Sequence, residues 1–156
     1  MAKDLDPTQL KGSLFRVWLS LFASLGVYTL FVVLIEPPPE VDPATDGNWT
    51  AVAVLAIVAV ALIVAARSFR QRNFFKKLDT GELEAGSQTY LREIRITWAA
   101  TWAMATMITI VGVVAYFFTF SLWAYLPFLG VSIALFIAYR LPSDIVGARH
   151  RPTDKS

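Results

Sequence analysis

Three stretches of this sequence carry no charged side chain, and their lengths limit what the chain can fold into. They cover 17–35, 47–66 and 96–139, which are 19, 20 and 44 residues long. A helix of about 20 apolar residues spans the ~30 Å hydrocarbon core of a bilayer. The first two stretches therefore predict one membrane-spanning helix each. The third is long enough for two such helices joined by a tight turn.

The composition agrees with a chain that is surrounded by lipid. Hydrophobic residues make up 56% of its 156 residues and charged residues 17%, which is too apolar for an ordinary water-soluble domain. The segment 51–66 reads AVAVLAIVAVALIVAA and is apolar on every face of a helix. We therefore expect an all-α integral membrane protein, a single membrane domain whose four transmembrane helices form two antiparallel hairpins.

The ends of the charge-free stretches and the breaks between them predict the boundaries of these segments. The transmembrane helices are expected at about 15–35, 49–66, 96–118 and 122–140. The segments that join and follow them are an external, acidic and proline-rich loop (36–48), a basic cytoplasmic helical segment (67–95) and a cytoplasmic tail (141–156). Helices 2 and 3 are predicted to extend past the membrane, with Ser87 as the N-cap of the third.

The basic residues predict which way the helices run. All 14 Lys and Arg side chains lie before or at the start of the first helix, between the second and third, or at the end of the fourth and beyond. The loop 36–48 and the turn 117–123 contain none. Because basic residues near the ends of membrane spans favour the cytoplasmic face, both termini and the segment 67–95 should be cytoplasmic. The expected location is the bacterial cytoplasmic (inner) membrane.

Small residues recur four apart on several predicted helices. In lipid, helices associate through close packing of small-residue faces, so these positions are candidates for helix packing. They are Ser20, Ser24 and Gly26 on the first helix, Thr97, Thr101, Ala105, Thr109 and Gly112 on the third, and Gly130, Ala134 and Ala138 on the fourth. A functional alternative is that the threonines line a polar path.

The basic segment offers candidate contacts to anionic lipid or to a protein partner. These are Arg67, Arg70, Arg72, Lys76, Lys77, Arg92 and Arg95. Solvated helix faces beside an anionic leaflet explain them most simply. In the protein-docking alternative, Phe74, Phe75 and Tyr90 would supply apolar anchors. Trp98 and Trp102, with two methionines one turn deeper, could hold a quinone or a lipid tail, although core packing explains them as well.

Several classes of function lack the residues they need. The three charge-free stretches contain no ionisable group of the kind that pumps and proton relays place inside the membrane. The sequence has no cysteine, and its one histidine is His150, in the tail. We assign no catalytic, cofactor-binding or metal-binding residue, and no motif indicates nucleic-acid binding. The chain is therefore not expected to be an enzyme.

These observations predict a non-catalytic accessory, stabilising or assembly subunit of a larger bacterial membrane complex, energy-transducing complexes included. Its expected partners are membrane lipids and other membrane-protein subunits or further copies of itself. One alternative is a small oligomeric channel or facilitator lined by the threonines of the third helix. Another is a lipid-interacting enzyme at the cytoplasmic surface that holds a phosphate with some of the arginines.

Overall fold

All regular structure in the described part of the chain is helical. The computed structural model describes residues 7–36, 38, 47–84 and 87–140. Its helices are α1 (Pro7–Leu34), α2 (Trp49–Arg70), the π-helical turn η1 (Gln71–Phe75), α3 (Lys76–Asp79), α4 (Gln88–Thr119) and α5 (Leu122–Ala138). α2, η1 and α3 follow one another without a break. The predicted tail, 141–156, and most of the predicted acidic loop lie outside the described residues.

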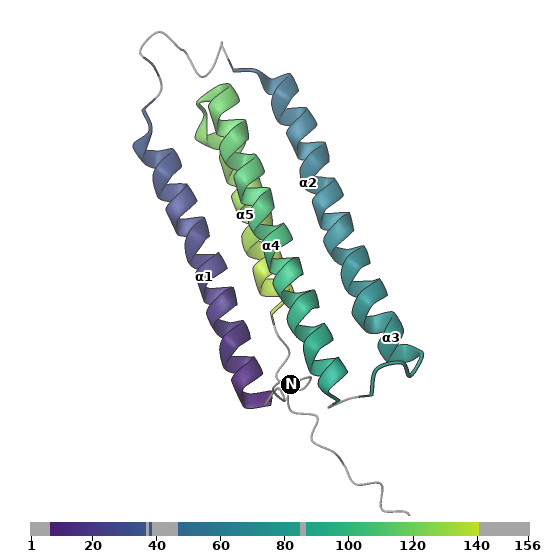
Figure 1. Cartoon of the computed structure of the whole chain (residues 1–156). Coiled ribbons are helices and arrows are strands. Elements are labelled where there is room, and N and C mark those ends of the chain that lie inside the picture. Colours follow the sequence, from purple (N-terminus) through teal and green to yellow (C-terminus); the bar gives the residue numbers. More distant parts are fainter. Residues whose placement is uncertain (1–6, 37, 39–46, 85–86, 141–156) are drawn as a thin grey trace, which may run out of the picture.

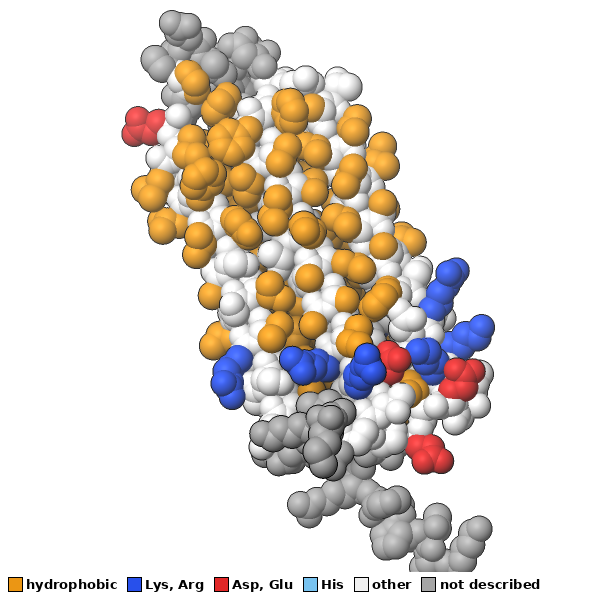
Figure 2. Space-filling model, in the orientation of Figure 1, with side chains coloured by type: hydrophobic (Ala, Val, Ile, Leu, Met, Phe, Trp, Pro, Cys, Tyr) orange, Lys and Arg blue, Asp and Glu red, His pale blue; other side chains and the backbone are white. Residues whose placement is uncertain are grey.

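α4 is the central helix of the bundle. It contacts α1, α2 and α5, and α5 lies alongside it while α1 and α2 lie on opposite sides of this pair (Figure 1). The chain reverses direction along the bundle axis from each long helix to the next (Figure 1). The starts of α1 and α4 therefore lie at the same end as α3 and the end of α5. We call this the basic end, because the visible Lys and Arg side chains gather there (Figure 2).

Three helical segments are long and apolar enough to cross a membrane. They are Gln9–Leu34, the continuous helix Trp49–Asp79, and α4. α5 is apolar but shorter, with 17 residues. Large apolar side chains of α1 and α2 are exposed along the bundle, and orange side chains cover most of the face in Figure 2. An exposed apolar surface of this extent suits lipid rather than water, which indicates a membrane protein.

The helix ends follow local sequence signals. The Tyr90 amide donates to the Ser87 hydroxyl over 3.1 Å, so the prediction that Ser87 caps this helix is confirmed. In the same way, the Ala51 amide donates to Oδ1 of Asn48 at the start of α2. α1 ends at Leu34, shortly before the run of prolines that cannot donate further helical hydrogen bonds. Pro127 lies inside α5, in its second turn.

Side-chain hydrogen bonds tie neighbouring helices together at both ends and in the middle. At the basic end, the Trp102 indole N–H donates to the carbonyl of Tyr139 over 3.1 Å. In the middle of the α4–α5 pair, the Ser132 hydroxyl donates to the Ala105 carbonyl over 2.8 Å. At the other end, the Tyr116 hydroxyl donates to the Ile35 carbonyl over 2.6 Å. In a medium without water these bonds fix the register of the helices.

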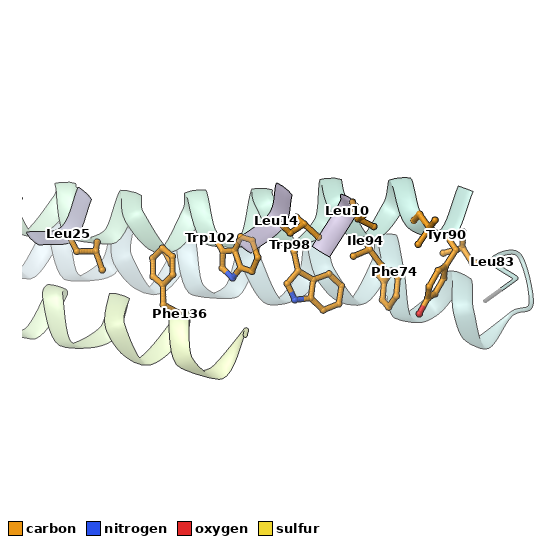
Figure 3. Packing of buried hydrophobic residues seen from close by; sticks show 12 residues of the cluster. Leu10, Leu14, Leu25, Phe74, Leu83, Tyr90, Ile94, Trp98, Trp102 and Phe136 are labelled. Atoms are coloured by element: carbon orange, nitrogen blue, oxygen red, sulfur yellow. The ribbon is translucent and has the colours of Figure 1, made fainter. Parts of the chain in front are cut away.

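The largest group of buried side chains fills the bundle towards the basic end (Figure 3). Leu10 and Leu14 of α1 meet Trp98 and Trp102 of α4, and Phe136 of α5 lies beside Trp102 (Figure 3). The two tryptophans have 0% and 1% of their surface exposed. Further towards this end, η1, α3 and the first turns of α4 enclose a continuation of the same cluster. It contains Phe74, Leu83, Tyr90, Leu91 and Ile94.

Candidate functional site

The predicted small-residue face of α4 lies in the interior of the bundle. All five of its residues are buried: Thr97, Thr101, Ala105, Thr109 and Gly112. Gly112 lets α5 approach α4 closely. A Cβ added at Gly112 would lie 2.7 Å from the Cβ of Phe128 and 3.2 Å from the Tyr125 ring, both on α5. A side chain at this position would therefore force α5 away from α4.

The small residues that were predicted on α1 and α5 are not in such contacts. Ser20, Gly26, Gly130, Ala134 and Ala138 are all exposed, and a Cβ added at either glycine would meet nothing within 4 Å. Ser24 is half-buried, and its hydroxyl donates to the Leu21 carbonyl of its own helix over 2.6 Å. The exposed residues among them face outward from the described bundle, where lipid or a partner would lie.

The threonines Thr97, Thr101 and Thr109 of α4 are buried in the interior of the described bundle. The Thr101 hydroxyl donates to the Thr97 carbonyl of the same helix over 2.7 Å. Thr97 and Thr109 are fully buried, and their hydroxyl oxygens have no hydrogen-bond partner among the described residues. The stripe therefore faces the packed interior, away from the surfaces at which further copies of the chain would meet.

Most of the candidate basic residues lie on the surface at one end of the bundle. Arg67, Arg72, Lys76, Arg92 and Arg95 are exposed. Lys77 forms an ion pair with Glu93, with 2.9 Å between Nζ and Oε1, and this pair joins α3 to the first turns of α4. Because both side chains are partly exposed, the pair stabilises this junction by less than about 1 kcal/mol.

The aromatic residues that were proposed as docking anchors are mostly core residues. Phe74 is fully buried and Tyr90 is 3% exposed, so neither ring is available to a partner on the surface. Phe75 is 38% exposed. Trp98 and Trp102 are buried in the core cluster, and only Met107 of the neighbouring thioether patch is exposed to a large extent. Core packing thus accounts for these rings.

Arg70 differs from the other basic residues because its guanidinium lies among aromatic rings. The Cζ atom is 4.6 Å from the ring centre of Trp98, 4.6 Å from that of Tyr139 and 5.3 Å from that of Phe75. These rings come from α4, from the residue that follows α5, and from η1. Each cation–π contact is worth about 0.5–2 kcal/mol, depending on how dry it is.

Two N–H groups at this arginine lack acceptors. Nε of Arg70 and Nε1 of Trp98 are buried, and neither has a hydrogen-bond partner among the described residues. A buried donor without an acceptor costs about 1–3 kcal/mol. Burial lowers the pKa of the Arg70 guanidinium, and the nearby Tyr139 offsets part of this shift. Arginine nevertheless stays protonated in proteins, so the group remains a half-buried cation.

The π-helical turn η1 follows Arg70 directly and places its neighbours. A π-helical turn holds one more residue than an α-helical turn, and such turns occur often at functional sites. Phe74, within this turn, packs edge-on against Trp98 with 5.2 Å between the ring centres. The turn therefore fixes the helix that carries Arg70 against the same indole that the guanidinium covers.

Sequence reasoning grouped Arg70 with the exposed bases and missed its aromatic surroundings. A usable signal was present, because Arg70, Trp98 and Tyr139 all lie within four residues of an end of a charge-free stretch. In a bundle with alternating directions, these ends meet at one level.

Comparison of the chain with protein-family models, with curated proteins and with solved structures gives no match.

Proposed function

We propose that this chain is a non-catalytic accessory or assembly subunit of a larger complex in the bacterial inner membrane. The observation that carries the proposal is the contrast between its two small-residue faces. The face on α4 is filled by the chain's own packing, whereas Gly130, Ala134 and Ala138 on α5 are exposed. An exposed face of small residues lets a helix of another subunit approach the backbone of α5 closely.

The proposed topology has four crossings with both termini in the cytoplasm. A 17-residue α5 is about 26 Å long, close to the thickness of a hydrocarbon core, and it lies antiparallel to α4 (Figure 1). All described Lys and Arg residues lie in or next to the half of a helix that is nearer the basic end. The bias of basic residues towards the cytoplasm supports this orientation.

The distribution of ionisable groups supports a structural role over a catalytic or transport role. The charge-free stretches supply no acid, base or histidine to the bundle interior, where a proton or ion path would need them. The threonine stripe, which the channel alternative requires at a pore, is buried inside a single chain. A subunit whose interior is devoted to packing acts through its outer faces.

Replacing Ala134 by leucine is expected to weaken partner binding without harming the fold. Leucine projects from the exposed face of α5 and prevents close approach of another helix, whereas the bundle itself has space there. We expect the yield of co-purified partner in mild detergent to fall about tenfold, the effect of losing ~1.4 kcal/mol of association free energy. Mass spectrometry of an affinity-purified tagged chain measures this yield.

The matched control is Ala61→Leu, the same change at an exposed position of α2. It should leave both the partner yield and the thermal stability as they are in the parent chain. If the parent chain purifies from native membranes in mild detergent only as a 17.3 kDa monomer with no other subunit, the proposed accessory role is wrong.

A further inference from the structure

Arg70 occupies the level of the lipid headgroups if the charge-free part of α2 crosses the membrane. It lies four residues beyond Ala66, the last residue of that stretch, and the helix continues without a break. Four residues of helix rise about 6 Å. The headgroup layer on each side of the hydrocarbon core is about 5–8 Å thick. The guanidinium is thus at the depth at which phospholipid phosphates lie.

Among the described residues, no acidic side chain pairs with the positive charge of Arg70. Within the described ranges, the one ion pair joins Lys77 to Glu93. Three rings lie close to the guanidinium: those of Trp98 and Tyr139, each with its centre 4.6 Å from Cζ, and that of Phe75. Aromatic rings hold the guanidinium in one orientation but do not neutralise it.

Two polar groups in this cluster are buried donors that lack an acceptor. Nε of Arg70 and Nε1 of Trp98 are buried without an acceptor in the described part of the chain, and Trp98 itself is 0% exposed. A ligand that pairs with the Arg70 guanidinium must supply acceptor oxygens and negative charge. A phosphate supplies both, and it matches the planar fork of a guanidinium with two parallel hydrogen bonds.

We propose that Arg70, held by Trp98 and Tyr139, binds the phosphate of an anionic phospholipid from the leaflet at the basic end. The exposed arginines beside it, Arg67 and Arg72, attract the same lipids only through their charge. Arg70 differs because its side chain is already ordered and partly dehydrated, so binding costs it less conformational freedom. The inference depends on the membrane placement of α2 and is independent of the accessory role.

The test measures the affinity of the purified full chain in a neutral detergent by native mass spectrometry. The probes are phosphatidylglycerol, phosphatidylcholine with the same acyl chains, and inorganic phosphate. We expect phosphatidylglycerol to bind more tightly than phosphatidylcholine. Arg70→Gln should weaken phosphatidylglycerol binding by about tenfold or more, as for the loss of a charged hydrogen bond. The control Arg67→Gln removes the same charge one turn away and should change the affinity by less than about twofold.

One further variant and the measurement with inorganic phosphate keep the test decisive. Arg70→Lys keeps the charge but loses the planar guanidinium, so it should also lose most of the affinity for phosphatidylglycerol. This variant replaces Arg70→Gln in the test if Arg70→Gln does not fold. Equal losses in Arg67→Gln and Arg70→Gln, or no loss in either Arg70 variant, would overturn the site. If inorganic phosphate displaces phosphatidylglycerol at equal concentration, the proposal that the bound phosphate belongs to a lipid is wrong. Absence of a co-purified partner would not affect any of these outcomes.

Discussion

Replacing Gly112 by leucine is expected to lower the free energy of unfolding by about 3 kcal/mol, at the upper end of what overpacking costs. The new Cβ alone would lie 2.7 Å from the Cβ of Phe128. That atom is attached directly to the backbone of α5, so a change of rotamer cannot move it away. Relief requires a shift of α5 relative to α4, and the shift also strains the hydrogen bond from Ser132 to the Ala105 carbonyl.

The measurement is reversible unfolding of the purified chain in mixed micelles, followed by circular dichroism. Gly26→Leu is the matched control, because a Cβ at Gly26 meets nothing within 4 Å. It should be neutral or should stabilise the protein by up to about 1 kcal/mol, since leucine favours helix more than glycine does. Similar losses for the two variants would show that the contact between α4 and α5 at Gly112 is not as tight as described.

Replacing Trp98 by alanine is expected to cost about 3–5 kcal/mol of stability, the range for truncating a large buried aromatic residue. The indole is fully buried and joins three parts of the structure. It packs on Phe74 of η1, lies under the guanidinium of Arg70, and belongs to the cluster that α1 and α5 complete (Figure 3). Its loss leaves a cavity at the point where these segments meet.

Trp123→Ala is the control for this prediction, because Trp123 is 80% exposed. It should change the free energy of unfolding in micelles by no more than about 0.5 kcal/mol. The same unfolding measurement serves both variants. A loss for Trp98→Ala no larger than that of the control would contradict the central place of the indole in the core.

The helices and the central face of the bundle could be predicted from sequence because their signals are local. A charge-free run of about 20 residues can hardly be other than a helix in lipid, since every backbone group must be satisfied within the segment. Ser87 was recognisable as a cap from the residues beside it. The threonines and Gly112 of α4 recur at helical spacing and are all buried.

The direction in which a small-residue face points could not be predicted in the same way. A helix that faces lipid and a helix that faces another helix are both apolar, so the pattern around Gly130 resembles that around Gly112. Only the position of α5 beside α4 shows that Gly112 lies in a contact and Gly130 does not. The setting of Arg70 depends on three segments far apart in the chain, which charge counting along the sequence treats separately.

The most direct test of the account is the side of the membrane on which each end of the bundle lies. The chain has no cysteine, so single cysteines can be introduced at Glu36, Arg72, Trp123 and Arg140, which are all exposed. A membrane-impermeant maleimide applied to intact spheroplasts should label positions 36 and 123, and positions 72 and 140 only after permeabilisation. Labelling of 36 and 72, or of 123 and 140, from the same side would contradict four crossings with a cytoplasmic basic end.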